Sequence, residues 1–307
     1  MITNTGKCRL GCLAVAFWSL IFAGCSPPSA SHTPAVGPPQ RIVSLSPAIT
    51  EILFAVGCGD RVVGVTSFCK YPPAAALLPK VGGFYDTNYE LVFSLQPDLV
   101  LHTIEHDAAA QNLQTLHLAH QALSCLTLPD IMASIRRTGA LCHATAAADA
   151  VVDGIQTRMK TIRSRIPADA PAPSVLITIG RDPNDGDLGS VFLAGPSTIY
   201  GEMLQLLGAR NVYQGQLAYA QIGREGIVRM NPDVIIDLAP DLNADDLDAQ
   251  ARLRADWEEL PSVTAVKQRR INVLTGDYVC IPGPRIAQTM ADIALAIYPA
   301  LVLEEAP

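Results

Sequence analysis

NYELVFSLQPDLVL (88–101) and GREGIVRMNPDVII (223–236) are the stretches that decide the fold, because the second repeats the first. When Glu90 is aligned with Glu225, a Pro-Asp pair coincides in the two stretches, and both run on into a branched, apolar strand. A weaker repeat relates TEILFAVG, at the start of the first half, to GEMLQLLG in the second. The chain is therefore expected to contain two related lobes with loops of unequal length.

Continuous apolar runs separated by longer helical patterns indicate buried strands in mixed α/β layers. Four such runs fall in each half. They are RIVSL (41–45), VVGVT (62–66), DLVLH (98–102) and CLTL (125–128), then SVLITIG (174–180), VFLAG (191–195), DVIIDLA (233–239) and INVLT (271–275).

The segment HATAAADAVVDGIQTRMKTIRSRI (143–166) predicts one long helix between the halves, since it is rich in Ala and free of Pro. At about 1.5 Å per residue such a helix reaches roughly 35 Å, enough to join two lobes. Two lobes joined by one helix form a cleft, and clefts between lobes bind small ligands. The expected apolar face of the helix recurs at threes and fours: Ala147, Val151, Ile155, Met159, Ile162 and Ile166.

The N-terminus predicts export, since Lys7 and Arg9 precede a short, mostly apolar run that ends at Gly24. Phe22-Ala23-Gly24-Cys25 resembles a bacterial lipobox, so Cys25 is expected to carry lipid and hold the protein to a membrane in the periplasm. Plain cleavage near the same point is the alternative. The predicted parts are a signal peptide (1–24), a Pro-rich, lipid-anchored tether (25–40), an N-terminal α/β lobe (41–142), a linking helix (143–166) and a C-terminal α/β lobe (167–307).

The composition excludes several classes of protein. Hydrophobic residues make up 49% of the chain and charged residues 17%, which is enough apolar material for a packed core. The formal net charge is -7 and no basic cluster appears, so no nucleic-acid partner is expected. Cys8 and Cys12 leave with the signal peptide. An odd number of cysteines then remains in the body, so at least one thiol stays free: Cys58, Cys69, Cys125, Cys142 and Cys280.

An ordered series of motifs in the first half carries a family resemblance: RIVSLSPAITEILFAVG, VVGVTSFCKYPPAA, LPKVGGF and PDLVL. REGIVRMNPDVII, WEELPSVTAVKQRRINVLTGDY and GPRI continue it in the second half. The series resembles periplasmic binding proteins of the cobalamin and iron-siderophore class. That resemblance implies two α/β lobes bridged by a single long helix, and delivery of a captured ligand to an ABC permease in the inner membrane.

Within this class the Ser-Pro-Ala-x-Thr-Glu and Tyr-Pro-Pro elements look most like cobalamin-binding members. A corrinoid would be transported, so no resident cofactor is expected. The resemblance implies that aromatic rings pack on the corrin, but Phe or Tyr replaces the family's Trp, and a ferric siderophore or haem remains the alternative ligand. Arg285 is expected to support its loop or a helix start, and Trp257 to be structural. The expected ligand residues are Phe68, Tyr71, Phe84, Tyr85, Tyr219, Asp277 and Tyr278. Cys69 and Cys280 would lie in cleft loops of opposite lobes, so we predict that they are not paired.

Glu90 and Glu225 correspond to family residues that contact arginines of the permease, one on each lobe. The expected partners are thus the ligand, the permease through both lobes and a membrane through the lipid anchor only, with the protein itself a monomer. A carboxylate also favours a helix N-terminus because it opposes the helix dipole, and this simpler interpretation applies to both residues.

Direct metal binding and catalysis are expected to be absent. His102 and His106 are four residues apart but lack the third and fourth ligands of a zinc centre, and His117, His120 and His143 fall in stretches read as helical. SLSPA and LAGPS are not the Gly-x-Ser-x-Gly elbow of a hydrolase. The acidic segment RDPNDGDLGS (181–190) lacks the distal Glu of a calcium loop and is read as a hinge or cleft loop.

Overall fold

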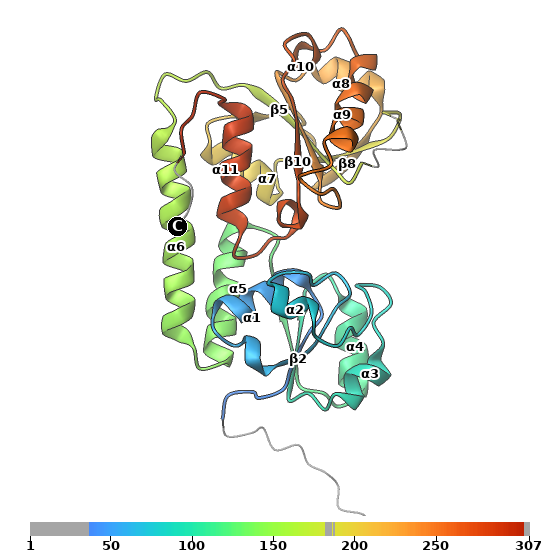
Figure 1. Cartoon of the computed structure of the whole chain (residues 1–307), viewed down its shortest axis with the longest axis vertical. Coiled ribbons are helices and arrows are strands. Elements are labelled where there is room, and N and C mark those ends of the chain that lie inside the picture. The colour runs from blue at the N-terminus through green and yellow to red at the C-terminus, as the bar shows by residue number, and fades with distance from the viewer. Residues whose placement is uncertain (1–36, 182–185, 187, 304–307) are drawn as a thin grey trace, which may run out of the picture. The chain divides into compact units, whose positions relative to one another are not determined.

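The computed structural model describes residues 37–303, except 182–185 and 187. The predicted signal peptide, Cys25 and most of the tether lie outside the described residues. The described part forms two α/β lobes joined by one long helix, which confirms the predicted fold class (Figure 1). No helix among the described residues is long and apolar enough to cross a membrane.

The first lobe is built on a parallel four-stranded sheet of order β2-β1-β3-β4. Alternate residues of its strands enter two different cores. Ile42 and Leu101 pack with α1 and α5, whereas Val43 and Val100 pack with α3 and α4. Helices therefore cover both faces, as a parallel sheet requires. The elements are β1 (Ile42–Ser44), α1 (Pro47–Ala55), β2 (Val62–Val65), α2 (Pro73–Ala76), α3 (Tyr89–Ser94), β3 (Leu99–Thr103), α4 (Asp107–Thr115), β4 (His120–Leu123) and α5 (Leu128–Leu141).

The second lobe has a mixed sheet of order β10-β9-β5-β6-β8, with the short β7 beside β5. β5, β9 and β10 are parallel, while β6 runs antiparallel to both β5 and β8. The elements are β5 (Ser174–Ile179), β6 (Val191–Ala194), α7 (Ile199–Leu206), β7 (Arg210–Asn211), β8 (Tyr219–Ile222), α8 (Arg224–Met230), β9 (Val234–Ala239), α9 (Leu247–Asp256), α10 (Thr264–Lys267), β10 (Ile271–Thr275) and α11 (Ile286–Ile297).

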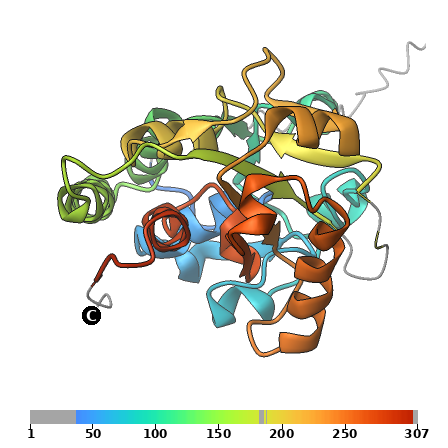
Figure 2. The same ribbon diagram turned by 90° about the horizontal axis from the view of Figure 1, so that it is seen from above.

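The long helix α6 (Thr145–Arg165) lies beside α5 and α11, and Figures 1 and 2 show α6 and α11 side by side. Its predicted apolar face is shifted in the first two turns, where Ala148 and Val152 are buried, Ala147 is exposed and Val151 packs half-buried against the core. The reason is a close approach to α5. A Cβ on Gly139 would lie 2.4 Å from the Cβ of Ala148, so the missing side chain makes room for that residue.

The sequence repeat has a structural counterpart at the start of each sheet. Asp98 accepts hydrogen bonds from the backbone N–H groups of Gln40 and Arg41, at 2.6 and 2.9 Å, just before β1. Asp233 accepts them from the N–H and hydroxyl of Ser174, at 2.8 and 2.7 Å, where β5 begins. Each aspartate thus fixes the entry of its lobe's central strand.

Two sequence expectations on local structure are wrong. The run 125–128 is not a strand, because Thr127 caps α5 by accepting a hydrogen bond from the N–H of Asp130. The strand lies earlier, at β4, and it contains His120. His117 and His143 end helices in left-handed conformations, with φ of 55° and 56°.

Candidate functional site

The predicted residues of the first lobe lie in loops near the carboxyl ends of its strands. Phe68 and Tyr71 follow β2, and Phe84 and Tyr85 lie in the loop before α3. Ligands of α/β sheets bind at this edge, where the strand order changes direction. Here the change falls at β1, which has β2 on one side and β3 on the other.

Four of the predicted aromatic rings are exposed to solvent. The exposed fractions are 58% for Phe68, 45% for Tyr71, 95% for Tyr85 and 52% for Tyr219. Single exposed apolar residues are ordinary, whereas several large exposed rings close together are less common on a protein surface. The first three rings belong to the first lobe and Tyr219 to the second, so each lobe has at least one of these exposed rings.

The Phe84 ring contacts two other rings of the first lobe. The Tyr85 ring meets it edge-on at 5.0 Å between centroids, and the His106 ring stacks on it at 4.5 Å. His106 is buried, its Nδ1 has no hydrogen-bond partner among the described residues, and burial lowers its pKa. The imidazole is therefore neutral near pH 7, with one ring nitrogen unused.

A second group of predicted residues surrounds Arg285, which precedes α11. Its guanidinium donates two hydrogen bonds to Glu51 of α1, one of them at 2.9 Å, and a third to Asp277 at 3.0 Å. The same group lies over the rings of Tyr71, at 4.1 Å, and Tyr278, at 5.5 Å. Arg285 therefore ties the two lobes together in addition to supporting its own loop.

Asp277 and Tyr278 already have intramolecular partners. One oxygen of Asp277 accepts from Arg285, and the hydroxyl of Tyr278 donates to Asp292 of α11 at 2.7 Å. Burial, followed by the interaction with Asp292, raises the pKa of Tyr278 to about 12. The Tyr278 ring also lines a cavity of about 410 Å³ between β10 and the helices α9 and α11. Its ring and hydroxyl therefore serve the second lobe's own packing.

Tyr219 is the first residue of β8 and not a loop residue as predicted. Although about half of the residue is exposed, partial desolvation raises the pKa of Tyr219, with further contributions from Cys280 and from Glu105 of the first lobe. Three further apolar side chains, which were not among the expected ligand residues, are also exposed: Ile104, Leu126 and Leu217. The sequence could have indicated Ile104 and Leu126, because each lies shortly after the end of a strand.

Glu90 and Glu225 occupy matching positions, each the second residue of a short helix, α3 or α8. Both are exposed. A carboxylate in the first turn stabilises a helix by about 0.3–1 kcal/mol. That effect accounts for their placement and leaves both carboxylates accessible to a partner.

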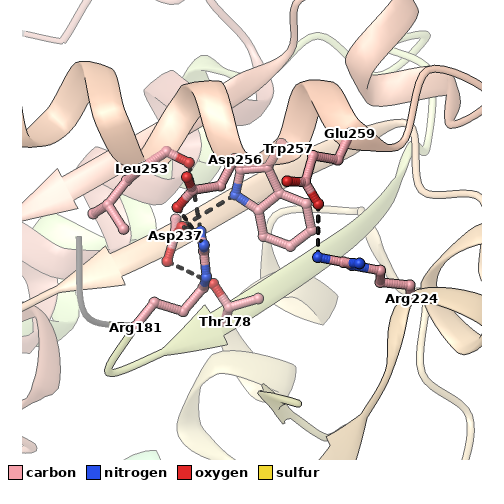
Figure 3. Close-up of polar contacts among 8 residues, drawn as sticks. All are labelled: Thr178, Arg181, Arg224, Asp237, Leu253, Asp256, Trp257 and Glu259. Carbon is pink, nitrogen blue, oxygen red and sulfur yellow. Dashed lines mark hydrogen bonds and ion pairs between the residues drawn. The ribbon is translucent and has the colours of Figure 1, made fainter. Parts of the chain in front are cut away.

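A buried polar cluster lies inside the second lobe (Figure 3). The guanidinium of Arg181 pairs with Asp237 and Asp256, each at 2.7 Å, and Asp237 also accepts from Thr178 at 2.8 Å. The indole N–H of the fully buried Trp257 donates to Asp237 at 3.1 Å, which confirms the structural role predicted for this residue. On the surface, Arg224 pairs with Glu259 at 2.7 Å. The cluster around Arg181 joins α9 to the sheet, and Asp256 is its partly exposed member.

The described part of the chain, residues 37–303 without their gaps, has neither a metal-ligand cluster nor a disulfide. In that part, no group of three or more His, Cys, Asp and Glu side chains is placed to hold a metal ion. Its five cysteines are free thiols. The sulfur of Cys69 lies 3.2 Å from the hydroxyl of Thr50 and 3.1 Å from that of Thr66.

Two α/β lobes, a single connecting helix and exposed rings from both lobes together define a two-lobed substrate-binding protein. The family model described as "Periplasmic binding protein" matches residues 42–278, and the chain belongs to that family. The chain is thus an extracytoplasmic binding protein of the kind that serves ABC importers.

Named relatives refine this class. The chain is 34% identical, over 272 residues, to the uncharacterized ABC transporter substrate-binding lipoprotein YvrC of Bacillus subtilis (strain 168), a match covering 85% of this chain and 81% of the relative. It is 29% identical to a cobalamin-binding protein of Halobacterium salinarum, covering 88% and 73%. A periplasmic heme-binding protein from Pseudomonas aeruginosa has the same fold, with a TM-score of 0.74, 26% identity and coverage of 86% and 94%.

Proposed function

We propose that this protein captures cobalamin between its lobes and delivers it to an inner-membrane permease. The observation that carries the proposal is the set of exposed rings contributed by both lobes: Phe68, Tyr71, Tyr85 and Tyr219. Aromatic rings bury large, rigid, flat area with little loss of side-chain entropy, which suits a corrin and its nucleotide base. The cobalamin-binding relative supports the same ligand.

Haem is the second candidate, and one observation favours it. Tyr85 is 95% exposed, so its phenol oxygen is open to a ligand. Imidazole and phenolate oxygen are both ligands of haem iron. The heme-binding neighbour in the structural comparison agrees with this alternative.

Delivery is proposed to use Glu90 and Glu225, one on each lobe, against basic residues of the permease. An exposed ion pair contributes only about 0.2–1 kcal/mol, so the two carboxylates would set orientation more than affinity. The proposed protein is a monomer held to the membrane by lipid on Cys25, with the proline-rich segment as its tether.

Titration of the purified protein with cyanocobalamin, hemin and a ferric chelate tests the ligand. We expect cyanocobalamin to bind with a heat signal and a shifted corrin absorption band. Tyr85→Ala and Tyr219→Ala should each weaken binding, whereas Phe93→Ala, at a ring on α3 about as exposed as Tyr219, should not. Tight hemin binding without cobalamin binding would replace the first candidate by the second.

Uptake into vesicles that contain the permease tests docking separately. Glu90→Lys with Glu225→Lys should reduce uptake while leaving ligand affinity unchanged, and each single reversal should have a smaller effect. Glu258→Lys with Asp248→Lys is a control with the same change of charge. Unchanged uptake by the Glu90 and Glu225 double variant would remove the docking role and leave ligand capture intact.

A further inference from the structure

A cavity of about 880 Å³ lies between α5, α6, α7 and α11, and none of the predicted ligand residues lines it. Pockets for small ligands measure roughly 300–1,000 Å³, so this one has room for a ligand of its own. It is also bounded by helices of both lobes, because α5 belongs to the first lobe and α7 and α11 to the second.

The deep part of this cavity is apolar. Leu128 and Met132 of α5, Met159 of α6 and Met290 of α11 line it, and all four are buried. Methionine side chains are flexible and polarisable, and they adapt to the shape of an apolar guest. Three methionines on three different helices therefore form a lining suited to an alkyl chain.

The mouth of the cavity is basic. Arg136 of α5 and Lys160 and Arg163 of α6 line it, and no Asp or Glu is among the described lining residues. Lys160 and Arg163 are exposed and three residues apart on α6, and Arg163 lies one turn after Met159. Arg136 pairs with Asp149 at 3.0 Å. Lys160 and Arg163 of α6 are therefore the cations available to a bound ligand.

We propose that this cavity binds an anionic, single-chain amphiphile such as a long-chain carboxylate. The alkyl chain would lie along the methionines, and the carboxylate would pair with Lys160 and Arg163. An apolar interior with cations at its mouth selects for this combination, because a neutral chain gains nothing from the cations and a cationic one is repelled. The site is separate from the proposed cobalamin surface and does not depend on it.

The test uses dodecanoate, at concentrations that form no micelles, and dodecyltrimethylammonium as a probe of equal chain length and opposite charge. Titration calorimetry on the full chain should show saturable, one-to-one binding of dodecanoate and much weaker binding of the cation. Equal affinity for the two probes, or no binding of dodecanoate, would overturn the proposal.

Substitutions at exposed positions test where dodecanoate binds. Lys160→Glu with Arg163→Glu should weaken dodecanoate binding about tenfold or more, since two attractions become repulsions. Arg252→Glu with Lys267→Glu makes the same change of charge on α9 and α10 and should leave binding unchanged. Ala133→Trp fills the cavity mouth from α5 and should abolish binding, whereas Ala140→Trp, exposed on the same helix away from the cavity, should not.

Other occupants give distinct results, and each would overturn the proposal. A dimer dispersed by Ala133→Trp would identify a second copy of the chain as the occupant. Dodecanoate binding by the full-length Cys25→Ala variant but not by the lipidated protein would identify the chain's own acyl group. Cyanocobalamin titration on the same variants keeps the two sites distinguishable, because its affinity should not respond to changes at the cavity.

Discussion

The two lobes hold the starts of their central strands in the same way, but they bury different polar side chains. Asp98 and Asp233 fix the entries of β1 and β5 in the same way, through acceptance of backbone N–H groups. Four residues further on, the equivalent strands β3 and β9 hold His102 in one lobe and Asp237 in the other, both buried. The repeat therefore preserves groups that satisfy the backbone, while a buried side chain can change when new partners accompany it.

The partners differ accordingly. His102 has a backbone carbonyl and the ring of His120, whose Nδ1 lies 3.1 Å from its Nε2. Asp237 has the charged Arg181 together with Thr178 and Trp257. A neutral pair costs less to bury than an ionised one, so the two lobes should respond differently to loss of a partner and to acid.

The largest expected effect follows from removing the charged partner. Arg181→Met leaves Asp237 buried without its cation and should lower the free energy of unfolding by about 3–5 kcal/mol. His120→Leu in the first lobe should cost about 1 kcal/mol, because only a neutral hydrogen bond is lost. Urea unfolding of both variants measures the difference, and equal losses would contradict the contrast between lobes.

A slightly smaller effect is expected where the lobes meet, at two glutamates related by the weaker repeat. Glu51 reaches from the first lobe to Arg285, and Glu202 reaches from the second to the N–H of Leu128 at 2.7 Å. Arg285→Met should cost about 3 kcal/mol because Glu51 is then buried alone. Glu202→Gln should cost less than about 1 kcal/mol in the same assay, because the amide oxygen can still accept from Leu128 and only the charge is lost. A loss from Arg285→Met no larger than that from Glu202→Gln would show that the Arg285 pair is not effectively buried.

As pH falls, stability should be lost first through His102 of the first lobe. Burial, followed by the neighbouring His120, lowers the pKa of His102 below its ordinary value of 6.5, against the hydrogen bond with Thr103. The unfolded chain therefore binds the proton more readily, and stability is lost as pH falls from about 6.5 toward the lowered pKa. His102→Gln should flatten this part of the stability profile, measured by thermal unfolding between pH 7 and 5. An unchanged slope would mean that another group titrates there.

The smallest expected effect concerns Asp98 and Asp233, the aspartates that hold the starts of β1 and β5. The backbone hydrogen bond to Ser174 holds the pKa of Asp233 below its usual range, so its stabilising contribution is present at neutral pH and is lost only as pH falls through that lowered pKa. Asp233→Asn should cost about 1–2 kcal/mol at pH 7, and Asp98→Asn, at an exposed position, less than about 1 kcal/mol. Equal losses of unfolding free energy in urea would show that the greater exposure of Asp98 does not weaken its contribution to stability.

The sequence predicted the lobes and the linking helix because repeat and periodicity are local patterns. It failed at 125–128, where a cap at Thr127 outweighed an apolar run, and at the start of α6, where Gly139 set the buried face. The aromatic loop positions could be carried over from the family resemblance. The interlobe role of Arg285 could not, since its partner Glu51 is more than 200 residues away and only the fold brings them together.

The apolar core that passes through α1, α5, α6, α7 and α11 is one continuous cluster shared by both lobes. Two lobes with separate cores could melt one after the other, but a shared core makes each lobe's packing depend on its neighbour's. The protein should therefore lose its structure in a single cooperative transition. A substitution in either lobe would then shift the melting of the whole molecule, so damage to one half of the binding surface is also damage to the other.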